Sequence, residues 1–527
     1  MAAVKGLGPR PLLVAALLVT GVRDAPAQSA LGSRYLPLDH WAYEYIQPLL
    51  TRGFLPGLNP LVQPYRRLDV ARALSRVDPD TLRQPLAGWV RLLKREFASE
   101  LSRQSGEQRT SAGLEAIAGA RGSSSRRLDP ARPVGTANAW PWYRGGGWVE
   151  AGPLAAELRV YGDLYFRDDP DGNDPGFDPR LRRGGKSDNA YGSVALPFGE
   201  LVVGHVARNW GPISSPGLMV SGVPTPYPQL AVELVAGRFA LRSFAAELDT
   251  VGTARRQMAA HRLDYTAKDL VLSLGEATVY LNPALQLRFL NPFELLVMDA
   301  NDRPQQNLML DAQLWLRRGG LVVYADALLD DIDISPTTPE PEPPQYGFTL
   351  SARYAGRGER SGAGGSAARG APLVLPPWIE LGAEYQQVGA WTYRTPNFAD
   401  RYSYFNRGLG ANYSDYDRLT LWADLYPPVP GLRISPTALL QRQGEGNFRD
   451  SIPGGYYWGR PALFWGVKET TLRLGLRGRY QPIRELWINW DLGPNFTRNR
   501  AHVTGVNRTS FEAVGEIGVR LVFPRSR

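Results

Sequence analysis

Residues 154–166, with the sequence LAAELRVYGDLYF, alternate between apolar and polar side chains over most of their length. A period of two predicts a β-strand whose two faces differ in polarity. The apolar face would carry Leu154, Ala156, Leu158, Val160, Leu164 and Phe166, and the polar face Glu157, Arg159, Tyr161 and Asp163. One strand of this kind also fits a soluble sheet with one face in water. The rest of the chain is therefore needed to distinguish a soluble sheet from a membrane barrel.

The same alternation recurs along the chain, for example in residues 307–317 (NLMLDAQLWLR) and 471–480 (TLRLGLRGRY). We mark about 18 such segments after residue 110, a number that fits a bacterial barrel with an even count of antiparallel strands. They begin near residues 112, 140, 154, 188, 199, 228, 238, 257, 269, 307, 320, 346, 378, 418, 431, 468, 485 and 511. The fold class predicted from this series is all-β, a large transmembrane antiparallel barrel.

The connections between these segments alternate between short and long, as they do when one end of a barrel faces the periplasm and the other the exterior. Short turns such as Gly152-Pro153 and Arg318-Gly319 fall on one side. The long loops on the other side are residues 167–187, 209–227, 281–306, 331–345, 391–417, 442–467 and 497–510. The Gly-, Ser- and Arg-rich stretch 355–377 breaks this rule, since it falls on the short side.

The N-terminus has the pattern of a secretory signal peptide. Lys5 and Arg10 precede the apolar run 11–20, and Ala25-Pro26-Ala27 forms a cleavage site of small residues. The apolar run is shorter than the ~20 residues that a membrane-spanning helix needs. We therefore expect residues 1–27 to be removed on export, and we expect the mature protein in the cell outer membrane, surrounded by its lipid.

Composition agrees with an all-β chain and excludes several classes of site. The sequence has 56 Gly, 44 Pro, 24 Tyr and 14 Trp among 527 residues, which favours many turns and aromatic girdles. It has no Cys, so no disulfide and no thiolate metal site can form. The net charge of +9 comes largely from Arg. It fits either guanidinium groups that bind phosphates or acidic sugars, or simply a solvated surface.

Residues 28–109 predict a small helical domain on the periplasmic side, ahead of a barrel formed by residues 110–527. Trp41, Tyr45 and Leu49 recur at helical spacing behind Asp39, a plausible N-cap. Residues 68–74 predict a second helix and residues 89–101 a third.

Two sets of residues resemble a known family. One is Arg208-Asn209-Trp210-Gly211-Pro212, followed by the apolar run 218–221 and the Pro-rich run 224–228. The other is Asn291-Pro292-Phe293-Glu294 with the strand pair that follows it. Both are similar to the capsule assembly Wzi family. That resemblance implies an eighteen-stranded barrel with a helical domain packed at its periplasmic side, and a lectin-like role in holding capsular polysaccharide.

The N-terminal segment also resembles an S-layer homology module. The matching residues are His40-Trp41-Ala42 with Ile46, the turn Gly53-Phe54-Leu55, and Arg66-Arg67-Leu68-Asp69. In some barrels such a module tethers the outer membrane to peptidoglycan, and this chain has a single copy.

Enzyme and cofactor signatures are missing from the sequence. The four His residues are His40, His205, His261 and His502, and none takes a metal-binding spacing. No nucleophile elbow, phosphate-binding loop or basic and aromatic nucleic-acid groove is present. The acidic run Asp330-Asp331-Ile332-Asp333 fits a calcium loop or, more often, a solvated loop mouth. We expect no enzyme activity, no cofactor and no nucleic-acid partner.

The external loops are rich in aromatic residues, which pack on the flat C–H faces of sugars while polar neighbours bind the hydroxyls. The same composition is typical of rings that pack within loops or at the membrane interface. The residues expected to bind polysaccharide are Trp391, Tyr393, Tyr402, Tyr404, Tyr413, Tyr456, Tyr457 and Trp458. The residues Arg208, Trp210, Gly211, Pro212, Asn291, Pro292, Phe293 and Glu294 are expected in external loops that can fold into the lumen as a plug.

Two functional hypotheses follow. The first is a monomeric outer-membrane barrel that binds or retains capsular or other extracellular polysaccharide. The alternative is a porin or transport channel, tethered to the cell wall through its helical domain. Eighteen strands enclose a lumen wide enough to conduct unless it is plugged.

Overall fold

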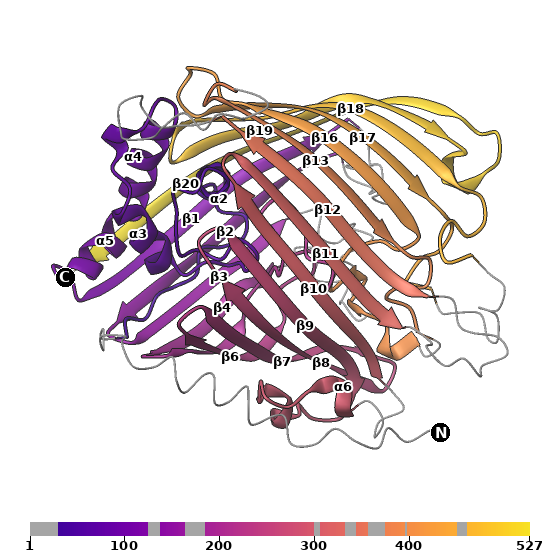
Figure 1. Ribbon diagram of the computed structural model, residues 1–527, viewed down its shortest axis with the longest axis horizontal. Helices are drawn as coiled ribbons and strands as arrows, with labels where there is room; N and C mark the ends of the chain where they lie inside the picture. Colours follow the sequence, from indigo (N-terminus) through magenta and orange to yellow (C-terminus); the bar gives the residue numbers. More distant parts are fainter. Residues whose placement is uncertain are drawn as a thin grey trace.

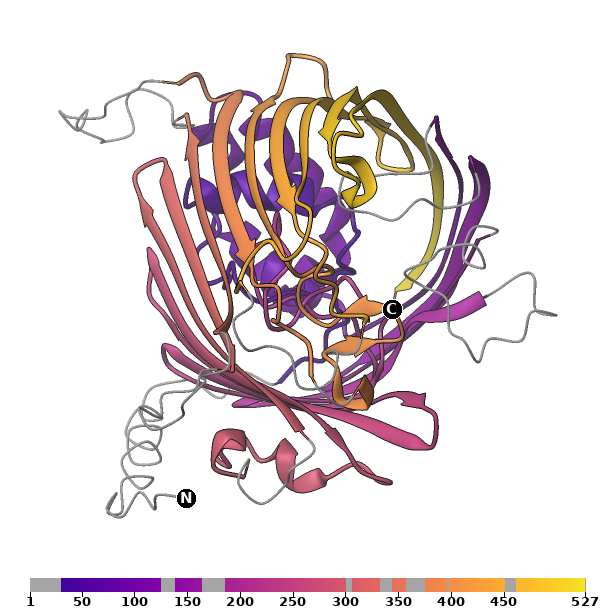
Figure 2. The same cartoon turned by 90° about the vertical axis from the view of Figure 1, so that its right-hand side faces the viewer.

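The computed structural model describes residues 30–124, 138–163, 185–299, 306–331, 344–356, 375–395, 398–450 and 461–526. Within them, 18 antiparallel strands form one closed barrel (Figures 1 and 2). They are β1 (Thr110–Ser123), β2 (Ala139–Ala151), β3 (Leu154–Asp163), β4 (Gly185–Leu196), β5 (Gly199–His205), β6 (Pro228–Ala236), β7 (Phe239–Val251), β8 (Ala254–Thr266), β9 (Leu270–Leu281), β10 (Gln306–Arg318), β11 (Leu321–Asp331), β12 (Gln345–Ala355), β13 (Ile379–Val388), β16 (Tyr416–Leu425), β17 (Leu432–Gln443), β18 (Glu469–Ile483), β19 (Leu486–Arg498) and β20 (Arg508–Ser526).

Each strand pairs with the next one along the chain, and the ring closes where β1 pairs with β20, with Ala116 opposite Leu521. The small hairpin of β14 (Ser403–Tyr404) and β15 (Arg407–Gly408) lies outside the barrel sheet, so β13 pairs directly with β16. The predicted fold class is confirmed, and every predicted strand start lies within a few residues of the observed one. The expected signal peptide and most of the Gly-, Ser- and Arg-rich stretch 355–377 lie outside the described residues.

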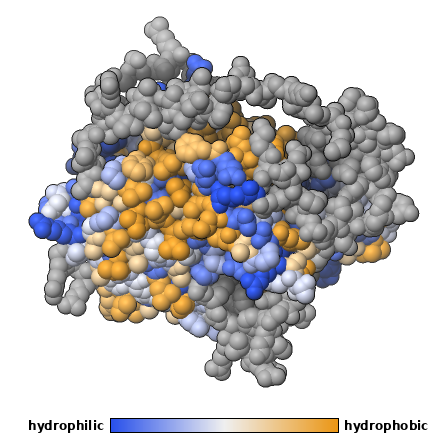
Figure 3. Space-filling view, turned by 90° about the horizontal axis from the view of Figure 1, so that it is seen from below, coloured by the Kyte–Doolittle hydropathy of each residue, from blue (hydrophilic) through white to orange (hydrophobic). Residues whose placement is uncertain are grey.

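The strands turn their apolar side chains outward. Along β18, Leu472, Leu474 and Leu476 are 40%, 46% and 43% exposed, whereas Arg473 is 2% exposed and faces the lumen. Apolar side chains gather in the same way over the face of the molecule that Figure 3 shows. Exposure of so many apolar side chains to water would be costly, at about 25 cal/mol per Å². The protein is therefore an outer-membrane β-barrel, whose closed sheet leaves no backbone edge unpaired in lipid.

No helix in the described part of the chain is long and apolar enough to cross a membrane.

The helical domain precedes β1 and consists of α2 (Tyr43–Thr51), α3 (Arg67–Ser75), the 3₁₀ turn η2 (Pro79–Thr81), α4 (Leu86–Glu96) and α5 (Ala98–Ser105). Its core contains Trp41, Ile46, Leu74 and Val90, all buried. The predicted third helix is two, because Phe97 leaves helical geometry between α4 and α5. Asp39 does not cap the first helix, as we had expected; it pairs instead with Arg144 and Arg159 of the barrel wall.

Ion pairs join the helical domain to the lumen wall at the barrel end that holds the C-terminus (Figure 1). Arg52 of α2 lies 2.9 Å from Glu380 of β13, and Arg103 of α5 lies 3.1 Å from Glu150 of β2. Seen from the opposite end, the helices lie within the outline of the ring of strands (Figure 2). The domain is thus docked onto the lumen wall at the end with short turns such as Gly152-Pro153, the end that faces the periplasm in bacterial barrels.

Acid is expected to loosen this domain through His40. Its Nδ1 accepts a hydrogen bond from the backbone N–H of Ala42 at 3.1 Å, so the ring is bound in its neutral form. Burial, helped by Arg520 and Arg67 and opposed by Glu96, lowers the pKa of His40 from 6.5 to about 4. The unfolded chain therefore takes up a proton first as the pH falls. The free energy of unfolding should be unaffected by His40 above pH ~6.5 and fall by about 3 kcal/mol down to pH ~4.

Urea unfolding of the domain, followed by tryptophan fluorescence between pH 7.5 and 4.5, measures this dependence. His40→Asn keeps an acceptor for Ala42 but does not titrate, so it should flatten the pH profile. His502→Asn, in the distant loop between β19 and β20, should leave the profile unchanged. An unaltered slope in His40→Asn would show that other groups cause the acid sensitivity.

Candidate functional site

Residues 206–227, between β5 and β6, turn into the lumen instead of outward. Trp210 is 1% exposed, and Leu218, Met219 and Val220 are fully buried. The side-chain amide of Asn209 closes the first turn of this plug. Its nitrogen donates to the backbone oxygen of Pro212 at 3.1 Å, and its oxygen accepts from the N–H of Gly217 at 2.9 Å. The loop is thus a folded unit held from within.

The plug is bonded to the barrel wall and to the helical domain. Gln313 of β10 donates to the backbone oxygen of Trp210 at 2.8 Å, and the Trp210 ring packs edge-on against Phe244 of β7 at 5.5 Å. On the periplasmic side, Asn209 and Gln63 of the helical domain form an isolated β-bridge. The plug and the domain therefore form one connected body inside the lumen.

Four of the residues selected from the sequence lie in this plug. Trp210 is its central ring, and Arg208 donates to Gln229 at the start of β6. A side chain at Gly211 would meet the backbone of Gly217 at 2.9 Å, so the turn needs glycine there. Pro212 follows as the acceptor for Asn209.

The described residues of three extracellular segments fold together over the plug, and we call them the extracellular cap: residues 389–395 with 398–416, residues 444–450 and residues 461–467. Tyr393 donates its hydroxyl to the backbone oxygen of Leu218 at 2.6 Å, and Tyr402 donates to that of Met219 at 2.9 Å. The two rings stack at 5.7 Å. The cap is therefore anchored on the plug beneath it.

Asp415 joins the three cap segments to one another. Its carboxylate accepts hydrogen bonds from the backbone N–H groups of Gly446 at 2.8 Å, Phe464 at 2.5 Å and Trp465 at 3.0 Å. Asp415 has a φ of 60°, in the left-handed region that Asp tolerates better than most residues. One side chain thus fixes loops that are far apart in the chain.

The aromatic residues predicted to bind polysaccharide fall into three groups. Trp391, Tyr393 and Tyr402 are fully buried in the cap. Tyr404 and Tyr413 are half-buried at its surface. Tyr456, Tyr457 and Trp458 lie outside the described residues.

Two further half-buried rings, Phe464 and Trp465, lie at the cap surface but were not among the selected residues. The guanidinium of Arg442 and the ammonium of Lys468 each lie 5.0 Å from the Phe464 ring centre. Arg449 lies 5.4 Å from the ring centre of Tyr413. Their position in an aromatic external loop was the available sequence signal, but only the fold shows which rings keep an exposed face.

The segment with Asn291, Pro292, Phe293 and Glu294 does not enter the lumen. It belongs to residues 282–299, which cover the outer face of β7 to β9 and include the turn η4 (Leu287–Leu290) and the short helix α6 (Leu296–Asp299). Ser243 donates to the Leu290 oxygen at 2.6 Å, and His261 lies 2.7 Å from the Phe289 oxygen. On the outward face of β9, the exposed Leu274 is followed by the buried Glu276. A charged residue on a face turned toward lipid indicates that another segment covers it, so this covering could have been inferred from the sequence of β9.

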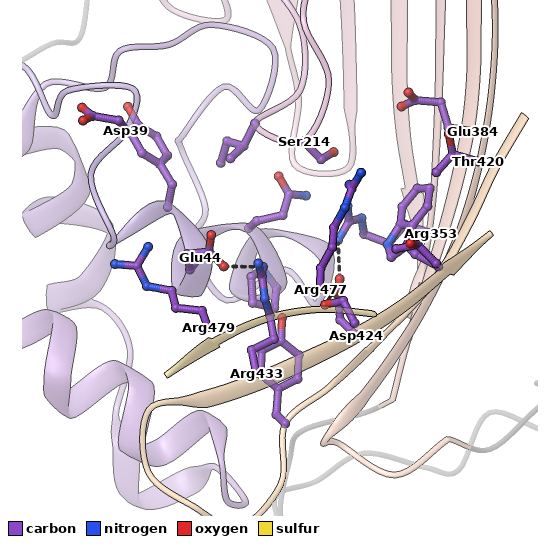
Figure 4. A pocket seen from close by; sticks show the side chains of 18 of the residues that line it. Asp39, Glu44, Ser214, Arg353, Glu384, Thr420, Asp424, Arg433, Arg477 and Arg479 are labelled. Carbon is purple, nitrogen blue, oxygen red and sulfur yellow. Dashed lines mark hydrogen bonds and ion pairs between the residues drawn. The ribbon is translucent and has the colours of Figure 1, made fainter. Parts of the chain in front are cut away.

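A separate cavity of about 440 Å³ lies in the lumen between α2 and the wall formed by β12 to β18 (Figure 4). Its volume is in the range of small-molecule sites. Side chains of both charges and one tryptophan, Trp422, line it. Among the described residues, no group of three or more His, Asp or Glu is placed to hold a metal ion.

Comparison with solved structures shows which known fold this barrel resembles. The structure of Wzi, described as an outer-membrane protein involved in group 1 capsule assembly in Escherichia coli and a carbohydrate-binding β-barrel, aligns with a TM-score of 0.59. The alignment covers 93% of this chain and 99% of Wzi. The chain shares the Wzi fold. Sequence identity to Wzi is 11%, so the likeness is one of fold alone.

Two Pseudomonas aeruginosa barrels align less closely than Wzi. OccD3 gives a TM-score of 0.44 at 11% identity over 79% of this chain and 91% of its own. OccD1 gives 0.44 at 12% identity over 78% and 95%. No family model matches the chain, and no curated protein matches its sequence.

Proposed function

We propose that this outer-membrane barrel binds extracellular polysaccharide on its extracellular cap and retains it at the cell surface. The observation that carries the proposal is the fixed aromatic surface of the cap. Tyr413 and Phe464 are half-buried at the cap surface, with cationic side chains beside each ring. Rings of this kind pack on sugar C–H faces, and the cations bind hydroxyl or acidic groups.

The rigidity of the cap favours binding, because loops that are already ordered lose little conformational entropy when a ligand docks. Asp415 and the tyrosines anchored on the plug supply that order. The filled lumen also favours a binding role over an open channel. Wzi, whose fold this chain shares, is described as carbohydrate-binding, which makes polysaccharide the first ligand to test.

The test measures binding of the cell's own surface polysaccharide to the mature protein in detergent micelles. Tyr413→Ala combined with Phe464→Ala should weaken binding about tenfold, equivalent to ~1.4 kcal/mol. Phe293→Ala is the matched control, because Phe293 is an exposed ring on the outer face of the barrel, away from the cap.

A cellular measurement accompanies the binding assay. Cells that carry the double variant should release more polysaccharide into the medium than cells with the wild-type protein or Phe293→Ala. If the wild-type protein ignores the polysaccharide and a deletion strain keeps it fully cell-associated, the proposal fails.

A further inference from the structure

The lumen cavity contains more positive charge than its neighbours neutralise. Five arginines line it, namely Arg353, Arg418, Arg433, Arg477 and Arg479. The carboxylates that line it are Asp39, Glu44, Glu384 and Asp424. Asp39 pairs with Arg144 and Arg159, neither of which lines the cavity. An excess of guanidinium groups in a recess of low dielectric attracts anions.

The excess is concentrated where β17 pairs with β18. Arg433 and Arg479 are directly opposite each other in the ladder and both face the lumen. Like charges in such a pair are destabilising, because their Cβ atoms lie only about 5 Å apart. Glu44 of α2 pairs with Arg433. Among the described residues Arg479 has no ion pair, and its Nε is buried without a hydrogen-bond acceptor.

Neighbouring carboxylates are already shared between two cations. Asp491 pairs with Arg473 at 2.7 Å and with Arg477 at 3.1 Å. Glu380 is shared in the same way by Arg52 of the helical domain and Arg353. Glu44 and Glu516 act on Arg479 electrostatically, but in the described part of the chain neither forms an ion pair with it. Figure 4 shows Arg433 joined to Glu44, with Arg479 and Arg477 on either side of that pair.

Farther along the same wall the cavity offers groups suited to a sugar ring. Trp422 lies opposite Thr437 in the ladder, four positions from Arg433 along β17. A side chain at Gly382 would meet the Trp422 ring at 2.1 Å, so glycine lets the indole lie against the wall. Thr420 and Ser435 line the same space and carry hydroxyl groups. Four residues of strand span about 13 Å, more than one sugar ring covers.

We propose that this cavity is a second binding site, specific for a short oligosaccharide that carries a carboxylate. The carboxylate binds between Arg433 and Arg479, and a neighbouring sugar unit packs against Trp422. Arg477, opposite Ser435 between these two levels, binds the connecting part. The site is separate from the extracellular cap. A negative result for polysaccharide binding to the cap therefore does not affect this proposal.

The experiment is calorimetric titration of the full mature protein in detergent micelles with trigalacturonate, maltotriose and succinate. Trigalacturonate should bind, and maltotriose and succinate should bind at least tenfold more weakly. Arg479→Gln should weaken trigalacturonate binding about tenfold, since a hydrogen bond to a charged group is lost. Trp422→Ala should weaken trigalacturonate binding and leave succinate binding unchanged.

Matched controls separate the site from general effects. Arg484→Gln removes an exposed arginine that pairs with Glu485 outside the cavity, and should bind trigalacturonate as the wild type does. Phe464→Ala in the cap should also leave this binding unchanged. The shift in gel mobility on heating shows that each variant is a folded barrel.

Several results would overturn the proposal. Equal binding by wild type and Arg479→Gln would show that the arginine pair is not the site. Equal affinity for maltotriose would remove the role of the carboxylate, and equal affinity for succinate would remove the role of the sugar. Absence of trigalacturonate binding to folded wild-type protein would exclude the site altogether.

Discussion

Wild-type protein in a planar bilayer is expected to show no steady large openings, whereas a variant without both the helical domain and the plug is expected to conduct. Eighteen strands enclose a lumen that is open unless side chains or loops fill it. Here Leu218, Met219 and Val220 of the plug are fully buried there. The helical domain occupies the periplasmic end through its ion pairs with the wall.

Single-channel recording of three variants resolves the contribution of each element. One variant lacks residues 30–108, one has residues 211–223 replaced by a Gly-Ser linker, and one combines both changes. Each single variant keeps one obstruction, so only the combined variant should show steady openings of high conductance. Large openings in the wild-type protein would instead support the porin hypothesis, and the fold shared with Wzi would then carry no common function.

The second large effect is expected at the buried pair of Arg103 and Glu150, whose side chains are both 0% exposed. Glu150→Gln leaves the Arg103 guanidinium buried without an anion. Removing one partner of a buried pair typically costs about 3–5 kcal/mol, because the remaining charge stays desolvated and uncompensated. The backbone N–H of Arg34, which also donates to Glu150, is tied to the same carboxylate. The docked helical domain should therefore detach at a much lower urea concentration.

Protease cleavage within residues 28–109, measured against urea in folded barrels, reports this loss. Arg103→Met added to Glu150→Gln should recover part of the stability, since no lone charge remains. Arg72→Gln is the comparison, because its pair with Asp69 is exposed and should change the free energy by less than about 0.5 kcal/mol. A similar small effect for Glu150→Gln would mean that the domain is held mainly by its apolar contacts.

The ion pairs that dock the helical domain and the arginines that line the lumen cavity have different roles. In ion pairs such as that of Arg103 and Glu150, each charge has a partner of opposite sign, and the pair fixes the domain in place. The opposed Arg433 and Arg479 are only partly neutralised, because α2 supplies one carboxylate for two guanidinium groups. The docked domain thus forms one wall of the cavity and leaves part of the charge of the opposite wall available for a ligand.

The strands themselves were predictable from the sequence. The alternation of Leu472, Arg473 and Leu474 assigns one face of β18 to lipid and the other to the lumen, and neighbouring strands repeat it. The period of two is a local property of extended backbone, so it is visible without any tertiary contact. The helical segment before residue 110 was visible for the same reason, through its period of 3.6 residues. The sequence did not predict the break between α4 and α5 at Phe97, nor the ion pairs of Asp39 with the barrel wall.

The site was only partly predictable. Trp210 and the cap aromatics stood out as apolar residues in loops, but their sequence does not say whether such rings are buried anchors, as Tyr393 is, or keep an exposed face, as Phe464 does. That difference depends on how three loops pack around Asp415. Likewise, chain order alone allows residues 282–299 to fold inward or outward, and the only sequence signal for the outer wall was Glu276, a charged residue on the outward face of β9.

The sequence by itself determined which residues face lipid and which face the lumen, because that choice follows from alternation within each strand. Only the tertiary structure decided which lumen residues meet. The register of β17 against β18 puts Arg433 opposite Arg479, and a shift of the pairing would put other residues opposite one another. The docking of α2 then decides that Glu44 neutralises one of them. Charge pairing across strands depends on their register, a non-local property that exists only once the strands have paired.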